Sequence, residues 1–235
     1  MQGKLQVLKS LNKYHVATFI TLLFHIFGCI GMFTSYQHWF ISYTPLNLLI
    51  VFVLVLLTQV KNTAFFGFMA LCFVTGMLVE MIGVKTGYLF GDYQYGSVLG
   101  PKLFEVPLLI GINWFIVVYC SGVVVTFFHN WLAAKYEEEG RILSPAIMNF
   151  SFVMDAALLT TFFDWLMEPV AVKLGFWHWN GTGEIPLLNY ACWFVISSLL
   201  LAVFRRLRFD KENLFAVHLF IIQLLFFGAL RTFLQ

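Results

Sequence analysis

Two long stretches without a charged side chain constrain the fold more than any other feature of this sequence. No Asp, Glu, Lys or Arg occurs in the 47 residues between Lys13 and Lys61, and none occurs in the 29 residues from Val106 to Ala134. Only 11% of the 235 residues are charged, against about 25% in a typical soluble domain. A water-soluble fold of this size cannot bury so much apolar surface. The sequence therefore excludes a soluble enzyme, a nucleic-acid-binding protein and a disordered chain.

Seven apolar windows are long enough for membrane-spanning helices, which need roughly 20 residues. These windows are 15–33, 44–60, 63–82, 106–128, 145–168, 186–204 and 213–230. They lack the two-residue alternation of barrel strands. We therefore predict an all-α polytopic membrane protein in which residues 1–235 form a single membrane domain with about seven transmembrane helices.

The basic residues indicate how the chain is oriented. If the N-terminus lies in the cytoplasm, ten of the 14 Lys and Arg residues fall in inner segments and four in outer segments. Cytoplasmic loops of membrane proteins carry an excess of these residues. We expect a multi-pass protein of the cell membrane with a cytoplasmic N-terminus and an external C-terminus. The sequence does not indicate its oligomeric state.

Cysteine and histidine patterns give no support for a metal or haem site. The four cysteines lie in apolar stretches, and none forms a CxxC pair. The six histidines show no metal-binding spacing on one helix, and the sequence has no glycine-rich phosphate loop. We therefore predict neither a metal nor a cofactor.

An internal repeat links residues 78–88 with residues 166–176. Five residue types coincide at a constant offset of 88 positions. They are Leu78, Glu80, Val84, Lys85 and Gly87 in the first copy, and Leu166, Glu168, Val172, Lys173 and Gly175 in the second. An aromatic cluster and a proline that opens the next window follow each copy. We predict a parallel two-helix repeat, with units at about 63–128 and 145–204, whose interface holds a site near the outer face.

Carboxylates inside membrane segments are costly and indicate function by default. Glu80 and Glu168 are repeat partners, and Asp164 lies one helical turn before Glu168, so the last two share a helix face. We expect these three to converge, where crowding and loss of water favour a protonated acid. The alternative is that each Glu ends its helix and pairs with Lys85 or Lys173.

Two further aspartates are supporting candidates. Asp92 lies in the first outer loop, where it could position water or cap a turn. Asp155 falls on roughly the opposite helix side from Asp164, and a packing contact with Asn149 or Ser151 is as plausible a role as a functional one.

Aromatic residues surround the acids in the sequence and could stabilise a cation or grip a flat hydrocarbon. They are Tyr93, Tyr95, Trp114, Trp165, Trp177, Trp179 and Trp193. A membrane belt of aromatic residues is the alternative for any one of them. An acid beside an aromatic cage suits carbocation chemistry on an alkene.

The outer-loop residues resemble those of the integral-membrane carotenoid hydratases, of the bisanhydrobacterioruberin hydratase and carotenoid 1',2'-hydratase type. The first half carries Glu80-x-x-Gly83, Thr86-Gly87, Phe90-Gly91-x-Tyr93-x-Tyr95, Leu99-Gly100-Pro101, Pro107 and Trp114. The second half carries Asp164, Pro169, Gly175-x-Trp177-x-Trp179, Ile185-Pro186, Asn189 and Trp193. The resemblance covers about residues 75–195.

This resemblance implies addition of water across the terminal C1=C2 double bond of an acyclic carotenoid, giving a tertiary alcohol. Protonation at C2 would give a tertiary cation at C1, which water captures without a redox cofactor. We expect Glu80 and Asp164 to be the acid/base set, supported by Glu168. The residues expected to bind substrate are Tyr93, Tyr95, Trp114, Trp177, Trp179, Asn189 and Trp193. The implied partners are membrane lipid and a carotenoid of the lycopene, γ-carotene or bacterioruberin-precursor type.

Two alternatives remain open from the sequence. A lycopene-type cyclase would use the same acid, but an internal alkene would capture the cation. A non-catalytic carotenoid-binding membrane protein would hold the pigment unchanged. A transporter is disfavoured because the polar residues of the windows gather toward the outer end.

Overall fold

A computed structural model describes residues 12–140, 144–181 and 183–234. Lys4, Lys9 and Arg141, three of the basic residues that indicate the orientation, lie outside these ranges.

A helix occupies each of the seven apolar windows, so the prediction of an all-α polytopic membrane protein is confirmed. The helices are α2 (Lys13–Gly31), α4 (Thr44–Thr58), α5 (Thr63–Thr86), α6 (Leu108–Glu138), α7 (Pro145–Lys173), α8 (Leu187–Arg206) and α9 (Leu214–Phe233). Within the described ranges, six are long and apolar enough to cross a membrane. The exception is α4, whose 15 residues span only about 22 Å. The short helix α3 (Gln37–Ser42), which we did not predict, precedes it.

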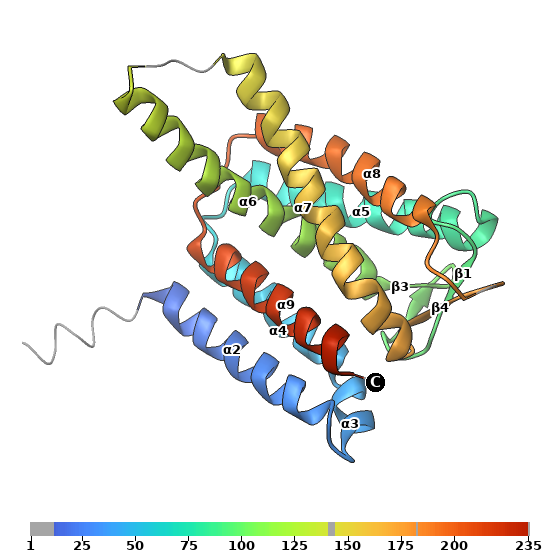
Figure 1. Cartoon of the computed structure of the whole chain (residues 1–235). Helices are drawn as coiled ribbons and strands as arrows, with labels where there is room; N and C mark the ends of the chain where they lie inside the picture. Colours follow the sequence, from blue (N-terminus) through green and yellow to red (C-terminus); the bar gives the residue numbers. More distant parts are fainter. Residues whose placement is uncertain (1–11, 141–143, 182, 235) are drawn as a thin grey trace, which may run out of the picture.

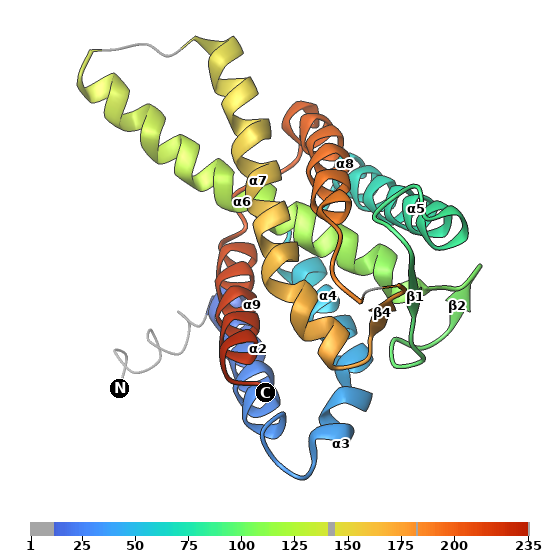
Figure 2. The ribbon, with the colours of Figure 1, turned by 45° about the vertical axis from the view of Figure 1, so that its right-hand side comes forward.

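Helices α6 and α7 cross the middle of the bundle (Figures 1 and 2). α5 and α8 pack on one side of them, and α9 with α4 and α2 lies on the other. The sequence of α6 explains its central place, because the helix is apolar on all sides and most of it is buried.

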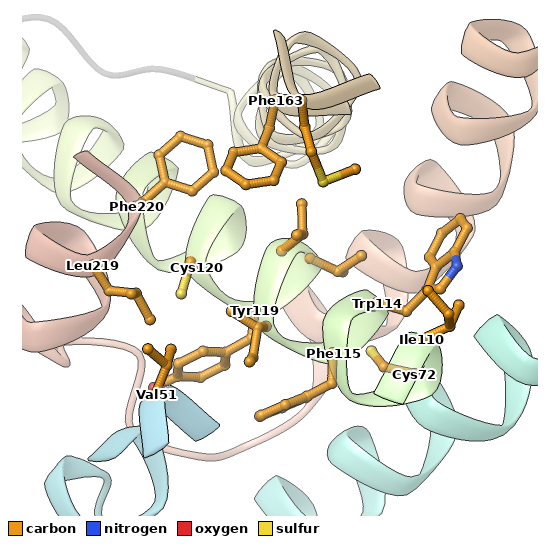
Figure 3. Packing of buried hydrophobic residues seen from close by; sticks show 14 of the residues in the cluster. Val51, Cys72, Ile110, Trp114, Phe115, Tyr119, Cys120, Phe163, Leu219 and Phe220 are labelled. Carbon is orange, nitrogen blue, oxygen red and sulfur yellow. The ribbon is translucent and has the colours of Figure 1, made fainter. Parts of the chain in front are cut away.

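The core is built from large apolar side chains on several helices. Figure 3 shows Val51 of α4, Cys72 of α5, Phe115 and Tyr119 of α6 and Phe163 of α7 meeting in the interior. Many other apolar side chains are exposed along the outer faces of the helices, as expected where acyl chains rather than water surround a protein.

Short strands lie at one end of the bundle. They are β1 (Tyr93–Tyr95), β2 (Lys102–Leu103), β3 (Val106–Pro107) and β4 (Trp177–Trp179). We call this the strand end. The C-terminus lies there too, since Nζ of Lys173, the last residue of α7, donates to the Leu234 carbonyl at 2.7 Å. α2 begins at the opposite end of the bundle (Figure 1).

Pro169 lies inside α7 and has no N–H to donate to the carbonyl of Trp165, four residues earlier. Arg231 of α9 supplies the missing donor, because its Nη1 lies 2.5 Å from that oxygen. The same guanidinium lies 3.7 Å from the centroid of the Trp165 ring. Arg231 thus allows a proline beside Glu168 without leaving a backbone carbonyl unpaired in the membrane.

Candidate active site

The two outer loops meet directly at the strand end. β1 and β4 pair antiparallel, with Tyr93 opposite Trp179 and Tyr95 opposite Trp177. The preceding helices both turn at a glycine with positive φ, Gly87 at 68° and Gly175 at 75°, a conformation that favours glycine. Because side chains alternate along a strand, Tyr93, Tyr95, Trp177 and Trp179 all point to one buried side of this ribbon.

Glu80, near the end of α5, lies beneath the ribbon and accepts three hydrogen bonds. Tyr93 donates to Oε2, Tyr95 donates to the same oxygen at 2.7 Å, and Trp114 Nε1 donates to Oε1 at 2.9 Å. The side chain is only 5% exposed. Three donors on one carboxylate stabilise its ionised form.

Glu168 is held in a similar but less complete way. Trp177 and Trp179 both donate to Oε2, at 3.0 and 3.2 Å, and no described residue donates to Oε1. The alternative in which Glu168 pairs with Lys173 is not observed, because Lys173 donates to the Leu234 carbonyl instead.

Asp164 has the fewest partners of the three acids. Asn189 donates to Oδ2 at 2.7 Å, while Oδ1 is buried and has no hydrogen-bond partner within the described part of the chain. The residue is 0% exposed. A buried oxygen without a donor suits a protonated carboxyl group, because the ionised form would leave a negative charge there without a hydrogen bond.

One small cavity brings the three acids together. Its volume is about 20 Å³, which is room for about one water molecule. All ten predicted catalytic and substrate-binding residues line it. They are Glu80, Asp164, Glu168, Tyr93, Tyr95, Trp114, Trp177, Trp179, Asn189 and Trp193.

Tyr93 and Tyr95 lie outside the helices and keep their phenol protons. Burial, together with the neighbouring Glu80 carboxylate, raises the pKa of both side chains well above the usual value. Both therefore remain hydrogen-bond donors to Glu80 at any physiological pH.

Three residues considered from the sequence lie away from the cavity lining. Asp92 joins the two loops, since Asn180 Nδ2 donates to its Oδ1 at 2.7 Å. Asp155 contacts His129 Nε2 at 2.9 Å rather than Asn149 or Ser151. Trp165, which we expected among the cage residues, is 43% exposed and packs against Arg231.

Other residues that shape the cavity did not stand out in the sequence. Ile110 and Met167 line it, and apolar residues on apolar helices give no signal of such a role. Gly76 does not line the cavity but lies close against Trp114, which does.

The residues of this cavity lie within the part of the chain that matches a known protein family. Residues 41–234, most of the chain, match the family model described as "Carotenoid biosynthesis protein". The chain belongs to this carotenoid biosynthesis family. The match includes every acid and every aromatic residue of the cavity.

The chain is also similar to one protein of known name. The chain is 27% identical over 139 residues to the bisanhydrobacterioruberin hydratase of Haloarcula japonica. The alignment covers 58% of this chain and 43% of the relative, so less than half the length of the relative is matched. No solved structure shows a significant match to the chain.

Proposed function

We propose that this protein is a carotenoid hydratase that adds water across the terminal C1=C2 double bond of an acyclic carotenoid end, giving a tertiary alcohol. The observation that carries the proposal is the single cavity in which three buried acids, a ring of aromatic side chains and room for one water come together. The family and the hydratase relative support the same chemistry.

Asp164 is the proton donor in this proposal. Its unpaired Oδ1 carries the proton, and the π electrons of the C1=C2 bond take that proton to form a C2–H bond, leaving a tertiary cation at C1. A positioned general acid typically accelerates such a step by about 10²–10⁴-fold.

Aromatic faces and the Glu80 carboxylate stabilise the cation. The rings of Tyr93, Trp114 and Trp193 line the cavity and present π electrons, each worth about 0.5–2 kcal/mol to a nearby cation. Glu80 adds a fixed negative charge. Its three donors leave it poorly placed to react covalently with the cation or to accept a proton.

Glu168 is the base in this proposal. Oε1, free of donors among the described residues, accepts a proton from the water as an oxygen lone pair of that water forms the C1–O bond. The proton then returns to Asp164, one helical turn away on α7, so both acids are restored. This refines the prediction from the sequence, which paired Glu80 with Asp164 and gave Glu168 the supporting role.

We further propose that the site arose by duplication, with units at about 63–128 and 145–204. The pairing of β1 with β4 and the two equivalent glycine turns support this.

We also place the strand end outside the cell membrane and the N-terminus in the cytoplasm. Two reporters fused in turn to the C-terminus test the orientation, one active only in the periplasm and one active only in the cytoplasm. We expect activity of the first, and activity of the second alone would reverse the orientation.

The decisive experiment is expression of the full chain in cells that make lycopene or γ-carotene, followed by mass analysis of the extracted pigments. A hydratase adds the mass of one water to the pigment. A cyclase gives a product of unchanged mass with a ring, and a binding protein leaves the pigment as it was. Either of those two results would overturn the proposal.

A further inference from the structure

A second, larger cavity adjoins the acid cavity. Its volume is about 580 Å³ and it lies between α2, α3, α4, α6, α7 and α9. Four residues line both cavities, namely Ile110, Asn113, Met167 and Trp177. The larger cavity, which we call the groove, therefore ends at side chains that also line the cavity of the three acids.

The groove opens toward lipid at its other end. Phe27 of α2 is 60% exposed and Leu46 of α4 is 48% exposed, and both line the groove. At the inner end Ile110 and Met167 are buried. Since exposed apolar residues of a membrane protein face acyl chains, an apolar chain can enter the groove from the bilayer and reach the border of the acid cavity without crossing water.

Several polar side chains interrupt the apolar wall of the groove. Three of them are His25 of α2, Asn47 of α4 and Gln223 of α9. The amide oxygens of Asn47 and Gln223 have no hydrogen-bond partner within residues 12–140, 144–181 and 183–234, and Gln223 is 93% buried. A side-chain amide can rotate by half a turn without changing shape, so each can present either oxygen or nitrogen to the groove.

His25 presents an acceptor. Its Nδ1 lies 2.8 Å from the Thr21 carbonyl oxygen, and a carbonyl only accepts, so Nδ1 carries the proton. In the neutral ring Nε2 is then a lone pair that needs a donor. The groove wall has no Lys or Arg among its lining residues, so it offers no cationic partner to a carboxylate or phosphate.

We propose that the groove holds the chain of a polyene and that His25, Asn47 and Gln223 bind a hydroxyl group which that polyene carries away from its reacting end. The identity of the polyene rests on the proposed function. A hydroxyl both donates and accepts, which satisfies the His25 lone pair and the two amides, whereas a ketone or ether cannot donate. The preferred substrate has therefore already been hydroxylated by a preceding reaction.

Binding to the full chain in lipid nanodiscs tests this without requiring turnover. Two acyclic polyenes that differ only by a hydroxyl at the remote end are titrated, and quenching of tryptophan emission gives Kd. We expect the hydroxylated polyene to bind about tenfold more tightly, as one net hydrogen bond allows. In the variant carrying Gln223→Leu and Asn47→Leu, the preference falls to about one while the affinity for the unhydroxylated polyene is retained.

Two glycine variants test the groove itself. Gly28 lines the groove, and Gly28→Leu fills it and weakens binding of both polyenes. Gly228→Leu, on α9, is the matched control because a Cβ there meets no atom within 4 Å. Equal binding of the two polyenes by the wild type overturns the hydroxyl site. Undiminished binding by Gly28→Leu overturns the groove.

The outcomes also separate this inference from the proposed function. Asp164→Asn, which removes the acid, is expected to bind both polyenes as the wild type does. Hydration by a wild type that shows no hydroxyl preference contradicts the inference alone. A clear preference with no hydrated product contradicts the hydratase proposal and leaves the groove in place.

Discussion

The indole of Trp114 stacks on the indole of Trp193, with ring centroids 3.8 Å apart and planes inclined by 4°. Each lies seven residues after the proline that precedes its helix, Pro107 or Pro186. Trp114 also donates to Glu80, so the stack links the first acid to α8.

Gly76 is the residue that leaves room for this stack. A Cβ at Gly76 would lie 2.5 Å from Cγ of Trp114, too close for any real contact. We expect Gly76→Ala to displace Trp114 from Glu80 and to destabilise the protein by about 1–3 kcal/mol. Thermal unfolding and near-ultraviolet circular dichroism of the stacked pair measure the two effects.

Gly67→Ala, on the same helix, is the matched control, because a Cβ there meets nothing within 4 Å. It should leave the dichroism unchanged and raise stability by up to about 1 kcal/mol, the gain in helix propensity. Equal effects of the two variants would show that Gly76 is not needed for the stack.

Asp164→Asn should lower the hydration rate by at least about 10²-fold, because an amide cannot supply the proton. The fold should persist, since Asn189 can still donate to the remaining carbonyl oxygen. Asp155→Asn, on the same helix but outside the cavity, should keep nearly full activity. Activity is measured as hydrated carotenoid formed per folded protein. Comparable activity in the two variants would rule out Asp164 as the acid.

Stability should fall as pH rises above about 10, the usual pKa of tyrosine. Burial, and then the Glu80 carboxylate, raises the pKa of Tyr93 and Tyr95 in the folded state, so the unfolded chain releases these protons first. The stabilisation is complete below that pH and is lost as pH climbs toward the folded pKa. Chemical unfolding at several pH values measures the slope of the unfolding free energy against pH. The comparison is the double variant carrying Tyr93→Phe and Tyr95→Phe. A double variant with the same alkaline slope as the wild type would contradict this account.

Arg231→Met should destabilise the protein by about 0.5–1.5 kcal/mol, because the Trp165 carbonyl loses its donor. Pro169→Ala restores a backbone N–H four residues after Trp165. Arg231→Met should therefore cost less unfolding free energy in the Pro169→Ala background than in the wild type. A double-mutant cycle from unfolding measurements gives the coupling. Strictly additive effects would mean that Arg231 does not replace the missing helix hydrogen bond.

Much of the site was predictable because its residues are chemically unusual for their surroundings. Glu80, Asp164 and Glu168 interrupt apolar helices, and the Tyr93/Tyr95 and Trp177/Trp179 pairs repeat an i, i+2 spacing. The short strands that join these pairs were not predicted, since three-residue strands rich in aromatic residues give the same pattern as a membrane belt. The partner of Asp155 was missed as well, because His129 belongs to a different helix.

The sequence by itself determined the class of the fold, since uncharged stretches of this length are stable only as helices in lipid. It also determined that Glu80, Asp164 and Glu168 lie within apolar helices, where burial of a carboxyl group costs free energy. Only the tertiary structure decided how those groups divide their hydrogen bonds. Glu80 receives three donors, Glu168 two and Asp164 one, because Tyr95, Trp114, Trp179 and Asn189 reach them from other segments. Such contacts depend on how helices cross, which no local pattern of residues specifies.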